Sequence, residues 1–391
     1  MNQIKNLKVA IVHHWLVMMR GGERVLEALT ELFPRADIFT LVCDKEKLSP
    51  ALQQREVRSS FLQRFPKSTE WYPYYLPLFP LATHYVDLSG YDLIISSDAA
   101  IIKGVRAGAR AVHICYCHTP MRCVWNVYED YHPSASTAIK LGLRALRKPM
   151  RQWDYEAAQR VTHFVANSQT VQSRIRNCYG RESSVIYPPV RTECFVNGRR
   201  FNRSGDFFLV ASQLVSYKRL DLVVKALSKA GKPLIVIGDG QERERLQRLA
   251  GPNIFFWGHQ PQDVIREAMQ RCAAFVFAGE EDFGIVMAEA QACGKPVIAY
   301  RKGGASEIVQ DGITGILFDE QTVDSILDAL NRFNPSSFDS DLIRDSALRF
   351  SKDRFFEEFS SFVRQVTSPD HNRIPITSAQ DAPRTASSKI A

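Results

Sequence analysis

The chain has 391 residues, of which 45% are hydrophobic and 24% charged, and these proportions are typical of a globular protein with two domains of ordinary size. No apolar run approaches the ~20 residues of a membrane-spanning helix, and the first residues lack the apolar core of a secretory signal, so we expect a cytoplasmic protein. The net charge of +8 belongs to residues 1–190, where 24 Lys and Arg face 16 Asp and Glu, so this half should meet phosphate, a membrane surface or nucleic acid.

A glycine pair follows the first predicted strand. Residues 7–12 are apolar and predict a buried strand, and Gly21 and Gly22 precede a helical pattern that begins at Val25. Paired glycines before a helix let backbone N–H groups approach a phosphate, although a flexible turn has the same composition. The spacing is not the GxGxxG of dinucleotide enzymes, which argues against hydride transfer.

Residues 61–81 interrupt the strand and helix pattern with closely spaced prolines and aromatic residues. Proline at this density does not continue a helix or a central strand, so we expect a loop. An aromatic loop of this kind is either a platform for an acceptor, a shallow membrane contact, or a segment packed on its own domain.

Two further strands are predicted at residues 91–96 and 111–116, and His118 follows the second. Parallel α/β sheets build their sites at the carboxyl ends of strands, and a neutral imidazole there can donate or accept a hydrogen bond. A lone histidine is more often structural, so the position alone does not assign His118 a function.

Residues 136–161 form a basic amphipathic pattern in which Pro149 should end or kink the helix. The pattern fits a surface for anionic lipid or polyprenyl diphosphate, and it equally fits a solvated helix with long cationic side chains. Residues 161–166 then predict a strand and Asn167-Ser168 a helix cap.

A proline-rich segment at residues 185–190 separates this half from a second one, which begins again with a strand at residues 207–211. Lys218 and Arg219 precede a predicted helix at residues 220–227, where cations can neutralise a departing diphosphate.

The stretch at residues 273–300 predicts a strand, a loop, a helix and another strand. Glu281 should lie in the loop before a helix that starts near Gly284, and Glu289 should lie just over one turn inside it. The helix N-terminus offers free N–H groups to an anion such as diphosphate, and each acid can bind hydroxyl groups. For two arbitrary glutamates, a helix cap and a solvated side chain would be the simpler interpretation.

Several short motifs occur in a fixed order along the chain: Gly21-Gly22-Glu23, His118-Thr119-Pro120, Asn167-Ser168, Tyr187-Pro188-Pro189, Lys218-Arg219, Glu281-x7-Glu289 and Gly303-Gly304. This order resembles the family 4 retaining glycosyltransferases, most of all bacterial mannosyl- and rhamnosyltransferases of O-antigen or exopolysaccharide assembly.

The resemblance implies the GT-B fold, an α/β architecture of two Rossmann-like, doubly wound parallel-sheet domains that face a central cleft. We expect an acceptor-side domain at residues 1–190, a nucleotide-sugar domain at 191–349, a helix at 350–366 that crosses back to the first domain, and a disordered tail at 367–391.

The resemblance also implies roles for individual residues. His118, Glu281 and Lys218 would be catalytic, and His118, Glu281 and Phe283 would bind the sugar. Two further sets of residues would bind the rest of the donor. The donor diphosphate would contact Gly21, Gly22, Lys218, Arg219, Gly284 and Ile285, and the ribose and base would contact Glu289, Gly258 and His259.

One position departs from the family pattern, because Gln213 stands where many relatives have an arginine. The departure puts a two-cation clamp on the diphosphate in doubt. No cofactor or metal is expected, since the Asp339-Ser-Asp341 motif lies in a polar segment away from any predicted strand end.

The implied function is transfer of a hexose, with mannose from GDP-mannose favoured, to a polyprenyl-diphosphate-linked or oligosaccharide acceptor, with possible contact to the inner membrane. Two alternatives share this architecture: a nucleotide-sugar-binding module without activity, and a UDP-sugar 2-epimerase. A nucleic-acid partner is not expected, because the basic residues form no recognition motif.

Overall fold

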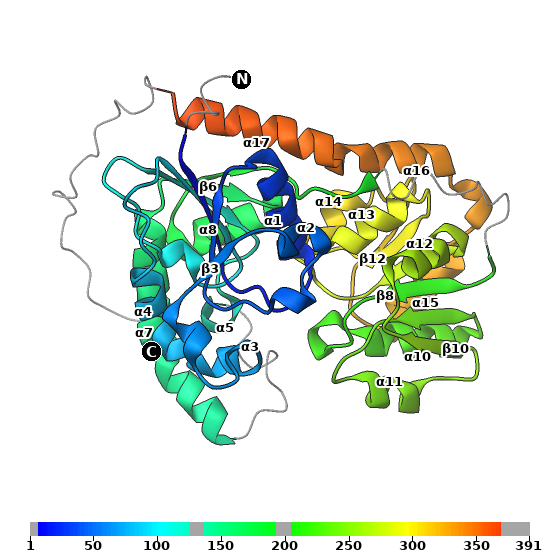
Figure 1. The fold of residues 1–391 in the computed structure, drawn as a ribbon. Coiled ribbons are helices and arrows are strands. Elements are labelled where there is room, and N and C mark those ends of the chain that lie inside the picture. Colours follow the sequence, from blue (N-terminus) through cyan, green and yellow to red (C-terminus); the bar gives the residue numbers. More distant parts are fainter. Residues whose placement is uncertain (1–6, 126–136, 193–204, 369–391) are drawn as a thin grey trace, which may run out of the picture.

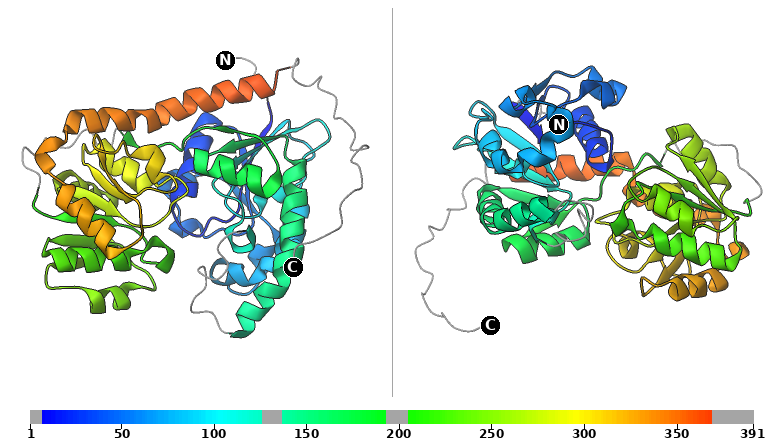
Figure 2. Two further views of the ribbon diagram at one scale, coloured as in Figure 1. Left: turned by 180° about the vertical axis from the view of Figure 1, so that it is seen from behind. Right: turned by 90° about the horizontal axis from the view of Figure 1, so that it is seen from below.

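The protein forms two α/β units that lie side by side, each built around its own parallel sheet (Figure 1). The coordinates are a computed structural model, and it describes residues 7–125, 137–192 and 205–368. Figure 2 shows the two units from behind and from below, with the long C-terminal helix bridging them. The expected fold class is confirmed, while residues 369–391 of the predicted tail lie outside the described residues.

The first sheet has seven strands in the order β3-β2-β1-β4-β5-β6-β7, and every neighbouring pair is parallel. Side chains of β1 alternate between two buried clusters, so Ile11 and Val12 enter opposite faces of the sheet. Burial on both faces accounts for the continuous apolar sequence of this strand. The strands are β1 Val9–His13, β2 Asp37–Thr40, β3 Val57–Ser59, β4 Leu93–Asp98, β5 Val112–Cys117, β6 His163–Ala166 and β7 Ser183–Val185.

Helices cover both faces of this sheet. They are α1 Gly21–Leu32, η2 Lys45–Lys47, α2 Pro50–Gln53, η3 Phe61–Arg64, α3 Ser68–Trp71, η4 Tyr72–Leu78, α4 Phe79–His84, η5 Ile102–Gly104, α5 Arg122–Trp125, α7 Thr137–Arg160 and α8 Gln169–Tyr179.

The structure bears on two expectations about proline, and the first was wrong. The segment predicted to be a loop at residues 61–81 is a series of short helical turns, and Pro73 and Pro80 lie in the first turns of η4 and α4, where the missing N–H group is not needed. Pro149 does not end its helix, because α7 continues through it to Arg160, and a kink there stays a prediction. Contacts of α7 with η5, α5 and α8 hold the helix across the one backbone hydrogen bond that proline removes.

The second sheet has six strands in the order β10-β9-β8-β11-β12-β13, again all parallel. Its strands are β8 Phe208–Ala211, β9 Leu234–Ile237, β10 Ile254–Gly258, β11 Ala274–Phe277, β12 Val297–Tyr300 and β13 Gly315–Phe318. Its helices are η6 Ser216–Lys218, α10 Leu220–Ala230, α11 Arg243–Leu249, α12 Gln262–Arg271, α13 Ile285–Ala292, α14 Ala305–Ile308, α15 Val323–Arg332, η7 Pro335–Ser337, α16 Ser340–Ala347 and η8 Leu348–Phe350.

The last helix, α17 Lys352–Val366, runs from the second unit across the first (Figure 1). Its Phe355, Phe359 and Val363 are spaced four residues apart and enter the core of the first sheet. Val190 pairs with this crossing, since its N–H donates to the carbonyl oxygen of Phe350 at 2.8 Å. Two chain segments therefore pass side by side between the units. No helix among the described residues is long and apolar enough to cross a membrane.

Candidate functional site between the two sheets

The glycine pair lies where the two units touch. Gly21 and Gly22 open α1, and a Cβ atom on Gly22 would lie 3.5 Å from Nε2 of His118, just beyond β5. A Cβ atom on Gly21 would lie 3.0 Å from the side chain of Ile285, at the start of α13 in the second unit. Three predicted groups are thus brought together, and a side chain at position 21 would crowd Ile285.

Lys218 and Glu281 meet on the second unit. The Lys218 Nζ atom lies 3.1 Å from Oε1 of Glu281, which follows β11 in the loop that leads to α13. Arg219 does not share this contact, because its Nε donates to Oδ1 of Asp221 at 3.2 Å. The exposed Gln213 lies in the loop after β8. Of the two predicted cations, only Lys218 contacts the predicted sugar-binding acid.

Glu289 is buried in α13 and forms an ion pair with Arg24 of α1. Burial raises the pKa of the Glu289 carboxyl, and the nearby Arg24 opposes that shift. Arg24 Nη2 also donates to Oε1 of Gln262 at 3.0 Å. The helix begins after Gly284, whose φ of 96° is in the left-handed region that favours glycine. The acid predicted for the ribose therefore already has a cationic partner from the other unit.

Further ion pairs join the units beside Glu281. Arg122 and Arg174 of the first unit both pair with Asp282, and Nη2 of Arg174 also donates to Oε1 of Glu280 at 2.8 Å. We call Arg122, Arg174, Glu280 and Asp282 the interdomain ion cluster. It holds both neighbours of Glu281, so the first unit fixes the position of the predicted sugar-binding loop.

Glu307 makes a second link. Its carboxylate accepts hydrogen bonds from the backbone N–H groups of Gln169 and Thr170, at 2.8 and 3.0 Å, and from the Thr170 hydroxyl at 3.0 Å. An acid from the second unit thus satisfies free N–H groups at the N-terminus of α8 in the first unit.

His118 belongs to a group of neutral histidines at the ends of β1 and β5. Its Nε2 atom lies 2.8 Å from Oγ of Ser97, and the same hydroxyl lies 3.0 Å from Nδ1 of His13. Burial lowers the pKa of His13, His14 and His118 to about 3, so all three are neutral at physiological pH.

Within the described part of the chain, His13, His14 and Glu23 bring three potential metal-ligand atoms within 4.8 Å of one another. Asp339 caps α16 by accepting from the N–H groups of Asp341 and Leu342, which gives the Asp-x-Asp motif a structural role.

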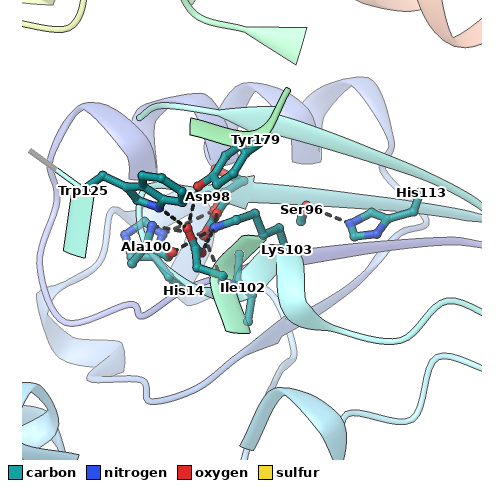
Figure 3. Close-up of polar contacts among 11 residues, drawn as sticks. His14, Ser96, Asp98, Ala100, Ile102, Lys103, His113, Trp125 and Tyr179 are labelled. Carbon is teal, nitrogen blue, oxygen red and sulfur yellow. Dashed lines mark hydrogen bonds and ion pairs between the residues drawn. The ribbon is translucent and has the colours of Figure 1, made fainter. Parts of the chain in front are cut away.

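A separate group of charges lies inside the first unit (Figure 3). Lys103 is fully buried, with Nζ 3.0 Å from Oδ2 of Asp98 and 2.5 Å from Oδ1 of Asp154. Trp125 Nε1 and the Tyr179 hydroxyl each donate to Asp154 Oδ2 at 2.8 Å. We call Asp98, Lys103 and Asp154 the buried ion triad. It fastens α5, α7 and α8 to the sheet beneath His118.

The two carboxyl groups of the buried ion triad have pKa values shifted in opposite directions. Burial raises the pKa of Asp154 despite the adjacent Lys103. Burial acts the same way on Asp98, but Lys103 and backbone N–H groups outweigh it and lower the pKa of this carboxyl.

Three predicted residues remain: Phe283, Gly258 and His259. The Phe283 ring is only 3% exposed and packs against Phe350 and Tyr187, with ring centroids 5.2 and 5.7 Å apart, so the ring lies in the core, and its contact with the sugar stays a prediction. Gly258 ends β10 with a φ of 70°, and the exposed His259 follows it. Contacts at these positions do not test the ribose and base assignment.

Each of the two units matches a glycosyltransferase family model. Residues 19–193 match the family model described as "Glycosyltransferase Family 4", and residues 196–340 match "Glycosyl transferases group 1". The chain belongs to the GT-B glycosyltransferases. The assignment agrees with the two separate parallel sheets and accounts for the order of the motifs along the chain.

Relatives of this GT-B glycosyltransferase differ in how much of the chain they share. The D-inositol 3-phosphate glycosyltransferase of Acidothermus cellulolyticus is 25% identical over 84% of this chain and 81% of its own length. A GDP-mannose-dependent phosphatidylinositol monomannoside mannosyltransferase of Mycobacterium tuberculosis is 32% identical over 42% of this chain and 50% of its own length. The chain therefore matches only half the length of some curated relatives.

Among solved structures, Anabaena HepE in complex with UDP-glucose superposes with a TM-score of 0.67 at 19% identity, over 91% of this chain and 99% of HepE. The lipopolysaccharide outer core galactosyltransferase WaaB, in its apo form, gives 0.63 at 17% identity, over 92% of this chain and 99% of WaaB. These likenesses establish the shared GT-B fold of the chain.

Proposed function

We propose that the protein is a retaining glycosyltransferase that moves a hexose from a nucleotide sugar to a lipid-linked or saccharide acceptor in cell-surface polysaccharide synthesis. The observation that carries the proposal is the position of Gly21 and Gly22, between His118 of the first sheet and Ile285 at the helix start of the second. A donor bound there would meet a neutral histidine, a helix N-terminus and the Lys218–Glu281 pair.

The proposed chemistry breaks the bond between the sugar C1 atom and the β-phosphate oxygen and forms a bond from C1 to the acceptor hydroxyl on the same face. The acceptor proton passes to an oxygen of the leaving diphosphate. Lys218 and the N–H groups at the starts of α1 and α13 would stabilise the charge that develops on that diphosphate. His118 and Glu281 would hold the sugar hydroxyls, and Glu289 would hold the ribose once Arg24 releases it. No metal is needed in this scheme.

The donor is the least constrained part of the proposal. GDP-mannose is favoured, and the M. tuberculosis relative is GDP-mannose-dependent. The HepE structure, however, contains UDP-glucose. The two donors differ in both base and sugar, so they make a direct test.

The acceptor side is proposed to approach the cytoplasmic face of a membrane. Trp71 and Tyr74 of the short helices at residues 61–84, and Tyr85 directly after them, are 44%, 66% and 68% exposed. A groove of about 410 Å³ lies beside α7, lined by Trp125, Lys148, Arg151, Gln152 and Tyr155. Aromatic rings with cationic side chains suit an interface that carries phosphate head groups. A polyprenyl diphosphate or an oligosaccharide linked to it is the proposed acceptor.

A panel of nucleotide sugars, including GDP-mannose and UDP-glucose, tests the proposal. One donor should stabilise the folded protein by mass action and, with a polyprenyl-diphosphate-linked saccharide, yield a product with retained configuration in the presence of EDTA. Glu281→Gln should abolish that product while the fold persists. Stabilisation without transfer or donor hydrolysis would favour the binding-module alternative, and release of free UDP with a 2-epimerised sugar and no acceptor would favour the epimerase.

A further inference from the structure

His118 is the last member of a chain of four polar side chains that begins at the N-terminus of α1. The Oε1 atom of Glu23 lies 3.6 Å from Nε2 of His13, Nδ1 of His13 lies 3.0 Å from Oγ of Ser97, and the same Oγ lies 2.8 Å from Nε2 of His118. Glu23, His13 and Ser97 are buried, and His118 is partly buried.

We call Glu23, His13, Ser97 and His118 the polar relay. Its hydrogen bonds can run in either of two directions, because the Ser97 hydroxyl has one proton to donate. If Ser97 donates to His13, it accepts from Nε2–H of His118, and His13 points its own Nε2–H toward Glu23. If Ser97 donates to Nε2 of His118, it accepts from Nδ1–H of His13. The Nε2 atom of His13 then points a lone pair toward the carboxylate of Glu23.

Glu23 decides between these directions. Its other oxygen, Oε2, already accepts the N–H of Arg20 at 2.9 Å, so the carboxylate is held in place as part of the helix cap. A carboxylate only accepts, and the buried Nε2 atom of His13 has no hydrogen-bond partner among the described residues, with Oε1 of Glu23 as its nearest acidic neighbour. A proton on this nitrogen gives a weak attraction, whereas two facing lone pairs repel in a buried setting.

We propose that Glu23, His13 and Ser97 are positioning residues that fix the tautomer of His118, so that Nε2 carries the proton and Nδ1 presents a lone pair. No hydrogen bond to Nδ1 of His118 occurs within the described residues, so this atom remains free to accept a hydroxyl proton. That the hydroxyl belongs to the donor sugar rests on the proposed function. The tautomer itself does not depend on it.

The same atoms define the potential metal site of His13, His14 and Glu23, and the proposal treats that group as metal-free. His14 serves as an internal reference, because its Nδ1 lies 3.3 Å from the carbonyl oxygen of Ser97, which can only accept, so His14 carries its proton on Nδ1.

Nitrogen NMR of the full-length protein, labelled with ¹⁵N-histidine, measures these tautomers near neutral pH, because the protonated and unprotonated nitrogens of a neutral imidazole resonate far apart. Substitution of each histidine in turn assigns the signals. The expected result is Nε2–H for His13 and His118 and Nδ1–H for His14. An Nδ1–H tautomer at His118 would overturn the proposal, and so would a stoichiometric metal in the purified protein by elemental analysis.

The substitution Glu23→Gln is the sharpest variant. Its amide oxygen can keep the bond to the Arg20 N–H, and its NH₂ group then faces His13 and donates to Nε2. Each hydrogen bond of the chain should reverse, and His118 should switch to Nδ1–H. In Ser97→Ala the chain is broken, so adding Glu23→Gln to that background should leave His118 unchanged.

Glu27→Gln is a matched control, since Glu27 is a buried acid on the same helix that contacts Ser49 and Arg191 instead of this chain. It should leave all three tautomers as they are in the wild type. A tautomer at His118 that responds equally to both glutamine variants, or to neither, would contradict the relay.

Kinetics separate this inference from the proposed function. With the active donor, Glu23→Gln and Ser97→Ala should raise the donor KM about threefold to tenfold with a smaller change in kcat, as for a lost neutral hydrogen bond to the substrate. Correct tautomers in a protein that binds no nucleotide sugar would leave the relay standing and remove the proposed function. Transfer activity in a protein whose His118 carries its proton on Nδ1 would support the proposed function and overturn the relay.

Discussion

The molecule contains two groups of ion pairs that differ in where they lie. The buried ion triad is enclosed within the first unit, where Lys103, Asp98 and Asp154 have no exposed surface. The interdomain ion cluster joins the two units, and Arg122, Arg174 and Asp282 keep 15–19% of their side-chain surface exposed. The enclosed group is held in one arrangement by the packing around it, whereas a partly exposed group between two units can open and reform.

The position of each group agrees with this difference. The buried ion triad ties α5, α7 and α8 to the sheet beneath His118, so it supports a fixed half of the site. The interdomain ion cluster and the Arg24–Glu289 pair hold residues that we assign to the donor. A Cβ atom on Gly21 would lie only 3.0 Å from Ile285, which leaves no room for a phosphate between them. Donor binding should therefore move Gly21 and Ile285 apart and break the Arg24–Glu289 ion pair.

Acid should break the first unit most strongly. Burial lowers the pKa of His13, His14 and His118 to about 3 and that of His113 to about 4. The unfolded chain takes up protons at these histidines below pH 6.5 and the folded protein does not, so the free energy of unfolding should fall as the pH drops from 6.5 toward these values. At pH 5.5 each histidine should cost about 1.4 kcal/mol, roughly 5 kcal/mol together.

Urea denaturation at pH 7.5 and 5.5 measures the loss. Replacing the exposed His84 by glutamine should leave the pH dependence unchanged. Equal stability of the wild type at the two pH values would contradict the buried, neutral state of the four histidines.

Removing the cation from the buried ion triad should have the next largest effect. Lys103→Met leaves two buried carboxylates without their partner and should lower the free energy of unfolding by about 3–5 kcal/mol. The exposed Arg176–Glu182 pair is the control, and Arg176→Ala should give no measurable change in the same denaturation experiment. A Lys103→Met protein as stable as the wild type would show that the triad does not hold the first unit together.

On the second unit, Lys218 should matter more for chemistry than for stability. Lys218→Ala removes the cation beside Glu281 and should lower kcat about 10²- to 10³-fold, as loss of a preorganised charge-stabilising group does. Arg219→Ala should lower it less, because Arg219 contacts Asp221. Similar rates for both variants in the donor assay would remove the distinction between the two cations.

The interdomain ion cluster should give the smallest change in stability and the largest change in shape. Asp282→Asn gives Arg122 and Arg174 a neutral partner at this position, although Arg174 keeps Glu280, and should cost about 1–2 kcal/mol. Small-angle X-ray scattering should show a larger radius of gyration in low salt for this variant. Asp328→Asn, in an exposed pair within the second unit, should change neither quantity. An unchanged scattering curve for Asp282→Asn would mean that other contacts hold the units together.

Local features of the site could be predicted from the sequence because their signals are local. The apolar segment before Glu281 and the helical pattern after Gly284 gave β11 and α13 within a residue or two, and the placement of Glu281 before the helix and Glu289 inside it followed. The helix cap at Ser168 was predicted correctly for the same reason, since its hydroxyl accepts the N–H of Val171.

Long-range partners could not be predicted in this way. Arg24 and Glu289 are 265 residues apart, and no periodicity or spacing connects them. The buried core around Phe283 was missed because its neighbours Tyr187 and Phe350 come from the segments that join the units. The helical turns at residues 61–84 were missed because proline is tolerated in the first turn of a helix, which a count of prolines ignores.

The central claim is that a nucleotide sugar binds between the two units and that its ribose replaces Arg24 as the partner of Glu289. Isothermal titration of the active donor into the wild type and into Glu289→Gln tests it most directly. The account predicts saturable binding by the wild type and at least tenfold weaker binding by the variant, since a carboxylate that binds hydroxyl groups is lost. Equal affinity for the two proteins would contradict it.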